Sequence, residues 1–483
     1  MKLNKKSLGK NAFLNGLKNV LNLLFPLLTF PYVSKVLDVK GIGQYNFAQA
    51  TVSYFSLIAG LGIASYATRE GARYRDGKKE FNTIASEVLL CNVISTIAAY
   101  LLLALCMIFV GKLKSYTALI WIFSIQIAFT TMGVEWIYSI YEEYEYITIR
   151  SIVFKIISII LIFIFVRNSD DTIKYAAITV FASVGSNILN LIHSRDYFQI
   201  VKVNIKDCAK HLKPILIIFA SNIAIMIYVY SDTTMLGFMQ TEYEVGIYSV
   251  SVKVYNIVKN LLSSVLIVSI PRLSMYYGSG KVKEFKITAQ KVYDSITALV
   301  MPSVIGLICV SKQLVLVLSG EAYISAETSL HILCIALLFC IYGWFFSQCI
   351  LMPAQREKTI LVATCVSAIV NIGLNFWLIP IWKENAAAFT TFVAEFIMFF
   401  VCVFYGFKIT KIKLLNKNML GVLVGCIGIV CVCKAVPLFD IGATMQLISA
   451  IMVSGILYGA ILIMLHNDVA SSILRKVYRT YEK

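Results

Sequence analysis

The chain has 483 residues and a formal net charge of +17, yet only 14% of its residues are charged while 59% are hydrophobic. A mean hydropathy of +0.79 is far too high for a water-soluble surface, which excludes a conventional soluble enzyme or binding domain. The sequence therefore predicts an all-α polytopic membrane protein whose main solvent is lipid.

Apolar stretches recur along the whole chain with short polar gaps between them. A helix needs about 20 residues to cross roughly 30 Å of hydrocarbon. We therefore expect about fourteen transmembrane helices. They are predicted over residues 12–37, 45–67, 84–110, 117–140, 148–166, 173–194, 212–238, 246–270, 293–318, 328–352, 359–382, 386–407, 419–437 and 445–466.

The basic residues are distributed unevenly between the two sides of these segments. With a cytoplasmic N-terminus, Lys and Arg gather in the inner loops at 69–79, 195–213, 272–291 and 408–417 and in the tail at 475–483. The outer loops hold few cations, as the positive-inside rule requires. We therefore expect both termini to be cytoplasmic. We expect no nucleic-acid partner, because no basic patch is interleaved with exposed aromatic residues.

Two short motifs occur twice. Gly-Gln-Tyr at 43–45 matches Gly-Ile-Tyr at 246–248, and Lys-Glu-Phe stands at both 79–81 and 283–285. Both pairs lie about 200 residues apart, which favours a repeat of six helices over coincidence. Parallel repeats are related by an axis along the membrane normal. The predicted domains are an N-lobe over 1–210, a C-lobe over 211–415, and two additional helices with a cytoplasmic tail over 416–483.

The loops give no support for catalysis. The outer loops are too short for a catalytic domain, and the inner loops hold no Gly-rich phosphate loop and no paired acidic motif. The twelve cysteines and four histidines show no metal-ligand spacing and no nucleophile pattern. We predict a protein that is not an enzyme and uses no cofactor and no metal.

Two predicted helices each carry a lysine among amide side chains on one face, at helical spacings of three and four residues. Polar side chains at membrane depth are costly, so they are expected to face a water-filled cavity. A lysine there can hold a phosphate, although either lysine can instead snorkel to the membrane surface. The predicted headgroup-binding residues are Asn15, Lys18, Asn22, Lys253, Asn256 and Asn260.

Shorter polar stripes suggest the same cavity. They consist of Gln49, Ser53 and Ser56 in the second segment, Ser183, Asn187 and Asn190 in the sixth, and Ser367, Asn371 and Asn375 in the eleventh.

Acidic residues are fewer within the predicted helices. Glu135, Asp232 and Glu395 each stand in an apolar segment. Each can bind a coupling proton or cation, or can neutralise a neighbouring lysine, and the sequence leaves both alternatives open.

Several segments together carry a family resemblance. The start of the chain at 11–32, Gly-Val-Glu-Trp-Ile-Tyr at 133–138, Tyr-Glu-Tyr-Ile-Thr at 144–148 and Ser-Asp-Thr-Thr-Met-Leu-Gly at 231–237 resemble the Wzx-type polysaccharide-repeat flippases. These form a branch of the multidrug/oligosaccharidyl-lipid/polysaccharide (MOP) exporter superfamily. The similarity extends over essentially the whole chain.

The resemblance implies a fold and an activity. The fold is MATE-like, with two six-helix lobes in a V, a pseudo-two-fold axis along the membrane normal and two extra C-terminal helices. The activity is alternating-access transfer of an undecaprenyl-diphosphate-linked oligosaccharide from the inner to the outer leaflet of the bacterial cytoplasmic membrane, for O-antigen, capsule or exopolysaccharide synthesis. The implied partners are the lipid-linked oligosaccharide, membrane lipids, a coupling proton or sodium ion, and a polysaccharide polymerase complex.

Two other functions fit the same composition. A MATE-like exporter of drugs or metabolites needs an acidic, aromatic cavity for cations, and the two lysines argue against it. A scaffold of a glycan-assembly complex without transport of its own has no use for polar stripes in lipid. The cationic cavity of related flippases often relies on arginine, whereas the residues predicted here are lysines.

Overall fold

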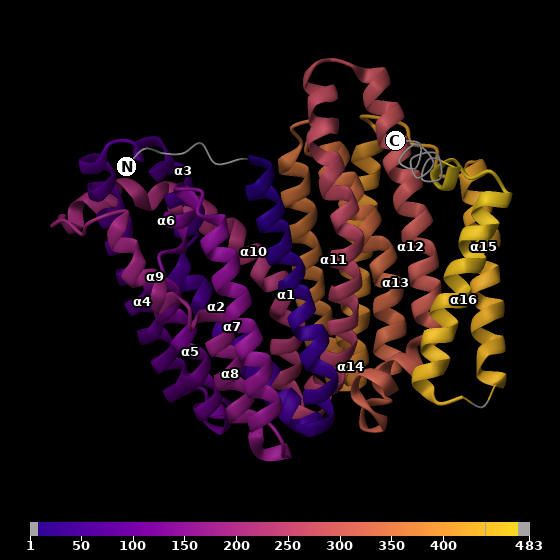
Figure 1. The fold of residues 1–483 in the computed structure, drawn as a ribbon, viewed down its shortest axis with the longest axis horizontal. Coiled ribbons are helices and arrows are strands. Elements are labelled where there is room, and N and C mark those ends of the chain that lie inside the picture. The colour runs from indigo at the N-terminus through magenta and orange to yellow at the C-terminus, as the bar shows by residue number, and fades with distance from the viewer. Residues whose placement is uncertain (1–7, 440, 472–483) are drawn as a thin grey trace. The chain divides into compact units, whose positions relative to one another are not determined.

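The computed structural model describes residues 8–439 and 441–471, with residues 8–13, 15, 19, 20 and 23 described by backbone alone. Within these ranges all regular structure is helical (Figure 1). Twelve stretches of the described chain are long and apolar enough to cross a membrane. The prediction of an all-α polytopic membrane protein is confirmed.

The count of about fourteen spans stays a prediction. The helix α14 (Glu357–Phe407) has 51 residues and is counted as one of these twelve stretches. At 1.5 Å per residue it measures roughly 76 Å, which is far more than one crossing requires. Its backbone breaks at Lys383, where φ is 52° and ψ is −128°, close to the gap between the segments predicted at 359–382 and 386–407.

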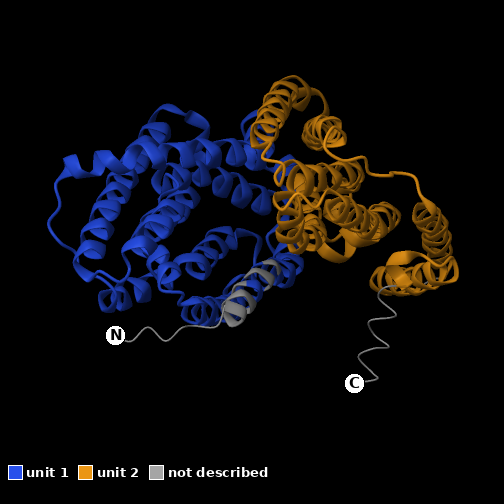
Figure 2. Ribbon diagram, turned by 90° about the horizontal axis from the view of Figure 1, so that it is seen from above, with its two compact units in different colours: residues 1–246 blue, residues 247–483 orange. Residues whose placement is uncertain are grey.

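The chain divides into two compact units, residues 1–246 and 247–483 (Figure 2). In the first unit α2 contacts α4 and α5, α5 contacts α8, and α7 contacts α1 and α8. The helices are α1 (Leu8–Val36), α2 (Asp38–Gly60), α3 (Ile63–Tyr74), α4 (Lys78–Phe109), α5 (Thr117–Met132), α6 (Glu135–Ile140), α7 (Tyr144–Phe165), α8 (Thr172–Val184), α9 (Asn187–His193) and α10 (Ala209–Met239), with 3₁₀ turns η1 (Gly111–Tyr116), η2 (Ser169–Asp171), η3 (Ser194–Asp196) and η4 (Ile205–Cys208).

Helix α10 belongs to the first compact unit, although the repeat assigns it to the C-lobe. Gly237 allows the close approach, because a Cβ there would stand 2.0 Å from the Phe47 ring on α2. Lys112 then donates to the carbonyls of Phe238 and Gln240, at 3.1 and 2.6 Å. These contacts hold the end of α10 in the first unit, and the predicted boundary at 210–211 stays a prediction from the repeat.

The two glycines of the repeated Gly-x-Tyr motif make reciprocal contacts. A Cβ on Gly43 would meet the Glu242 carbonyl oxygen at 1.8 Å, and a Cβ on Gly246 would meet the Val39 carbonyl oxygen at 2.0 Å. Each glycine thus lies against the residue four positions before the other. Such a reciprocal pair is what a local two-fold relation between the two motifs produces.

The second unit is built mainly from long helices. Here α13 contacts α14, α12 contacts α15, and α15 contacts α16. Its elements are α11 (Glu242–Gly278), which starts in the first unit, α12 (Val282–Ser319), η5 (Glu321–Tyr323), α13 (Ala326–Trp344), the π-helical turn η6 (Phe345–Leu351), α14, α15 (Lys417–Ala435), η7 (Val436–Leu438) and α16 (Ala443–Met464).

Polar contacts fasten the last two helices to α12. The Asn418 amide donates to Asp294 at 3.1 Å and to Asp468 at 3.1 Å, and Tyr458 donates to the Ala298 carbonyl at 2.7 Å. The two additional helices predicted within 416–483 thus pack against α12 in the second unit.

The predicted polar stripe of α14 has a packing role. Thr390, from beyond the break, donates to Asn375 at 2.6 Å, while the amides of Asn375 and Asn371 donate to Asn371 and Thr390 at 3.2 and 3.3 Å. All three side chains are buried. They satisfy one another across the break of α14, and the interpretation of this stripe as cavity lining is wrong.

Removal of one member tests that role. Thr390→Val keeps the volume but removes the hydroxyl that bonds both Asn371 and Asn375, which costs about 1–3 kcal/mol. We expect a lower melting temperature of the purified protein. Thr364→Val is the control, because Thr364 donates to the Ile360 carbonyl of its own helix turn and its loss leaves no buried amide unpaired. Equal melting temperatures for Thr390→Val and the wild type would contradict the packing role.

Candidate anion-binding site

The site begins at a break between α5 and α6. Val134 has a φ of 39°, a strained conformation for a β-branched residue. Gly133 lies against Asn187, where a Cβ would stand 2.5 Å from the amide carbon. The Asn187 amide donates to the Phe129 carbonyl at 2.9 Å, near the end of α5. Asn187 thus supports the break, which makes Glu135 the first residue of α6.

Glu135 is shared by two cations from different helices. Lys18 Nζ on α1 lies 2.5 Å from Glu135 Oε1, and Arg150 Nη2 on α7 lies 3.9 Å from Glu135 Oε2. A third cation, Lys155 on α7, donates to Asn22 Oδ1 on α1 and is close enough to Lys18 for the two to repel. We call Lys18, Arg150 and Lys155 the cation cluster.

Contacts along α1 and α7 hold the cluster together. The two helices lie side by side in the first unit (Figure 1). Thr148 donates to the Leu14 carbonyl at 3.2 Å near one end, and Tyr32 donates to the Val166 carbonyl at 2.7 Å near the other. Their relative register is therefore fixed on both sides of the cluster.

Arg150 is the most buried member of the cluster. It is 7% exposed, and its guanidinium carbon lies 5.7 Å from the centre of the Tyr146 ring. Its Nε and Nη1 atoms are buried and have no hydrogen-bond partner among the side chains and backbone that the structure describes. Buried donors without a partner are costly. An anionic ligand that accepts from them would remove that cost.

The charges of the described residues that meet in this site do not balance. The cluster carries three positive charges, and the carboxylate it contacts carries one negative charge. Guanidinium groups bind phosphate through two parallel hydrogen bonds, and ammonium groups bind it as compact point charges. The site is therefore suited to an anion with more than one negative charge.

The structure brings together three residues that the sequence singled out in the first unit, namely Lys18, Asn22 and Glu135. The side chain of Asn15 lies outside the described residues. Asp232 is buried on α10 and is not among the residues that contact Glu135. The roles of all five stay predictions.

The predicted residues of the second unit form a different arrangement. Glu395 is buried, accepts from Tyr255 at 2.9 Å and lies 3.6 Å from Lys259 Nζ. This contact fits the charge-balancing alternative. Along α11, Lys253 is half-buried while Asn256 and Asn260 are exposed. That these three share one cavity with Lys18 stays a prediction.

Sequence reasoning missed Arg150 and Lys155. Both stand inside the apolar stretch predicted at 148–166, and a cation within a membrane span is itself a functional signal. Neither residue lies on a stripe of amide side chains, which is the pattern that distinguishes Lys18 and Lys253 in the sequence. Their significance depends on contact with α1, which helical periodicity does not reveal.

The chain is similar to one known family and to two curated proteins. A family described as "Polysaccharide biosynthesis protein" matches residues 8–277. A protein of Escherichia coli (strain K12) named "Putative O-antigen transporter" is 25% identical over 406 residues, which cover 82% of this chain and 95% of the relative. A Shigella dysenteriae protein of the same name is 25% identical over 378 residues, covering 77% and 92%.

Solved structures share the fold at lower sequence identity. "Lipid II flippase MurJ, inward closed conformation" superposes with a TM-score of 0.77 at 15% identity and covers 95% of this chain and 99% of that one. An inward-facing multidrug resistance MATE family transporter of the MOP superfamily gives a TM-score of 0.63 at 13% identity, covering 80% and 93%. At these identities the likeness concerns the fold alone.

The anion preference of the cluster can be tested without any knowledge of the natural ligand. Glu135→Gln removes the carboxylate that the cluster contacts and keeps its shape. We expect pyrophosphate to raise the melting temperature of this variant by about 2–4 °C more than that of the wild type, because the added anion replaces the lost charge. Thermal unfolding of the purified protein with and without pyrophosphate measures this.

Glu395→Gln is the matched control, because the Glu395 carboxylate contacts one lysine. Its pyrophosphate response should equal that of the wild type. An anion-binding role for the cation cluster is contradicted if Glu135→Gln and Glu395→Gln respond to pyrophosphate equally.

Proposed function

This chain belongs to the polysaccharide biosynthesis protein family, and we propose that it is a flippase for lipid-linked oligosaccharides. The substrate is an undecaprenyl-diphosphate-linked repeat unit, which the protein moves from the inner to the outer leaflet by alternating access. The repeat unit then enters O-antigen, capsule or exopolysaccharide synthesis. Transport changes the location of the substrate and no covalent bond in it.

The cation cluster is the observation that carries this proposal. Among the described residues, Lys18, Arg150 and Lys155 bring three positive charges together on α1 and α7 beside the one carboxylate of Glu135. Lipid makes such an excess costly, so an anionic ligand is the natural balance. A diphosphate provides two negative charges and many acceptor oxygens.

The names of the relatives support the same substrate class. Both curated relatives are named as O-antigen transporters, and each is covered over more than nine-tenths of its own length. We propose the same substrate class for this chain, because the cation cluster suits the diphosphate of such a substrate.

The proposed transport mechanism follows from the environment, polar or lipid, that each part of the substrate needs. The diphosphate and sugars need a polar environment, so they travel past the cluster, while the polyprenyl tail stays in lipid. Two negative charges that move outward across an inside-negative potential of 100 mV gain about 4.6 kcal/mol. In this scheme Glu135 holds Lys18 and Arg150 in place between substrates and gives way to the diphosphate.

We also propose where the protein lies in the cell and what it interacts with. The protein lies in the bacterial cytoplasmic membrane with both termini in the cytoplasm, and its two lobes are those predicted at 1–210 and 211–415. Lys253, Asn256 and Asn260 contribute to the headgroup cavity. A proton or sodium ion serves as coupling ion, and a polysaccharide polymerase complex receives the product.

A multidrug exporter of the same fold is the alternative. Exporters of organic cations need acidic or aromatic cavities, whereas the described site has more cations than carboxylates. The flippase is therefore the function that the site favours.

Loss of the gene product tests this function in cells. We expect cells without it to lose one surface polysaccharide and to accumulate its undecaprenyl-diphosphate oligosaccharide on the cytoplasmic leaflet. Polymer analysis and extraction of the lipid-linked intermediate measure both effects. Normal polymer together with altered sensitivity to cationic drugs would favour the exporter instead.

Complementation with variants tests the proposed residues. Arg150→Gln should reduce polymer at least tenfold, since it removes a charge-assisted contact of about 1.5–3 kcal/mol to the substrate. Lys253→Gln should reduce it as well. Lys358→Gln, which changes an exposed lysine near the start of α14, should restore full polymer at equal membrane abundance. Full polymer with Arg150→Gln would remove the cluster from the mechanism.

A further inference from the structure

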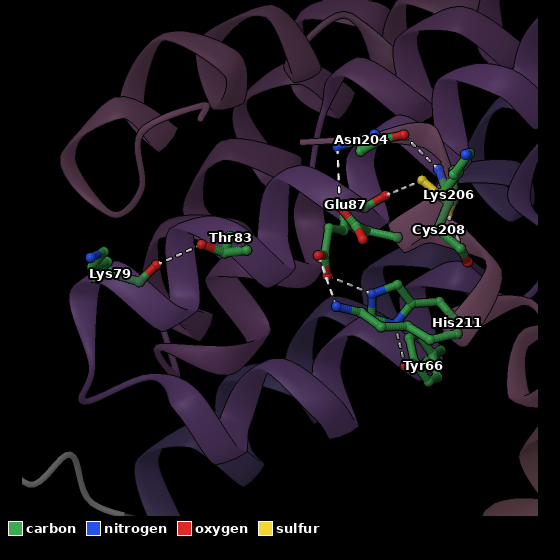
Figure 3. A network of polar contacts seen from close by, with 11 residues as sticks. Tyr66, Lys79, Thr83, Glu87, Asn204, Lys206, Cys208 and His211 are labelled. Carbon is green, nitrogen blue, oxygen red and sulfur yellow. Dashed lines mark hydrogen bonds and ion pairs between the residues drawn. The ribbon is translucent and has the colours of Figure 1, made fainter. Parts of the chain in front are cut away.

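A buried network of polar side chains joins α3, α4 and the first turn of α10, away from the cation cluster (Figure 3). Lys210 donates to one Glu87 oxygen at 2.8 Å, and His211 Nε2 lies 2.8 Å from the other. His211 Nδ1 lies 2.6 Å from the Tyr66 hydroxyl. These groups satisfy one another, so the network fastens three helices together and offers little to a ligand.

A second group of polar side chains in the first unit lines a cavity of about 360 Å³. The cavity lies where three loops meet, which join α1 to α2, α4 to α5 and α7 to α8 (Figure 1). With the cytoplasmic N-terminus predicted from the sequence, all three loops face the outside of the cell. Each loop contributes polar residues to the cavity, among them Asp38, Lys40, Gln44, Ser115, Asp170 and Thr172.

Local hydrogen bonds hold the walls of this cavity in place. Asp38 Oδ1 accepts from the Gly41 amide at 2.9 Å in the first turn of α2. Asp171 Oδ2 accepts from two backbone amides of its own loop, at 2.8 and 3.0 Å. A Cβ on Gly41 would stand 2.8 Å from the Thr172 hydroxyl oxygen, so the first turns of α2 and α8 lie close together. The cavity is therefore formed before any ligand binds, which lowers the cost of binding.

Several groups in the lining are available to a ligand. The side chains of Gln44, Ser115 and Asp170 have no hydrogen-bond partner among the residues that the structure describes. The amide and the hydroxyl can each donate and accept, and the carboxylate accepts. A ligand that fits this set therefore presents several groups that both donate and accept hydrogen bonds, as the hydroxyls of a sugar do.

The charge and size of the cavity narrow the class of ligand. Asp38 and Asp170 stand against Lys40 in the lining, so the cavity has no excess of positive charge and does not favour a phosphate. Leu119 and Ile173 add apolar surface, which can pack against the C–H groups of a sugar ring. Ligand pockets measure about 300–1,000 Å³, so this cavity is large enough for a short saccharide.

We propose that this cavity is a saccharide-binding site on the outer side of the first unit. Asp170 accepts from hydroxyls of the sugar, while Gln44 and Ser115 donate and accept. The site is separate from the cation cluster, because α1 rises roughly 27 Å between Lys18 and its end at Val36. The consequence for transport, which rests on the proposed function, is that the cavity holds the glycan of a repeat unit that has reached the outer leaflet.

Saturation-transfer NMR of the purified full-length protein in nanodiscs tests this site. The probe is the set of short oligosaccharides that mild acid releases from the cells' own surface polysaccharide. We expect the wild type to bind them and Asp170→Ala to bind at least tenfold more weakly, because hydrogen bonds to a charged group are lost. Ser115→Trp, which fills the cavity, should weaken binding as much. Lys114→Trp, at an exposed neighbour outside the lining, should bind like the wild type.

Two outcomes overturn the proposal. One is the absence of oligosaccharide binding by the wild type, a measurement that needs no variant to fold. The other is equal affinity of the wild type, Asp170→Ala and Ser115→Trp. A flipping assay in liposomes separates this proposal from the proposed function. Binding that depends on Asp170 and Ser115, without transfer of a lipid-linked oligosaccharide, would refute the flippase and leave the saccharide site standing.

Discussion

The constraint on which the site depends is that a charge within a membrane span must find a partner. The Glu135 carboxylate is the partner of cations from two helices, because it forms ion pairs with Lys18 of α1 and Arg150 of α7. The break at Gly133 and Val134 supplies that carboxylate at the start of α6. Lys155 adds a third positive charge beside this one carboxylate, and this excess is what the proposed anionic substrate would balance.

In the second unit, the buried carboxylate is balanced by its own neighbours. Glu395 is matched by Lys259 and by the Tyr255 hydroxyl, which makes a buried and balanced group. The amides of α14 likewise satisfy one another through Thr390. In the first unit, the described residues Lys18, Arg150 and Lys155 thus bring three cations together on α1 and α7 beside one carboxylate.

Composition and hydropathy were sufficient to predict the fold class, and the resemblance of a few motifs was sufficient to predict the family. The sequence also indicated Lys18, Asn22 and Glu135, because polar groups in apolar segments stand out by themselves. It did not indicate Arg150 or Lys155, whose roles depend on which helices are neighbours. The same limit explains Asn371 and Asn375. Helical spacing places them on one face, but it does not say whether that face meets water or Thr390.

The most direct test of the central claim is flipping by the purified protein in liposomes. An undecaprenyl-diphosphate oligosaccharide is placed in one leaflet, and its arrival in the other is followed by the access of a glycan-cleaving enzyme added outside. We predict transfer by the wild-type protein and a loss of transfer in the double variant Arg150→Gln, Lys155→Gln. Equal transfer by empty liposomes, or by the double variant, would contradict the account of a cationic site that carries a lipid-linked diphosphate.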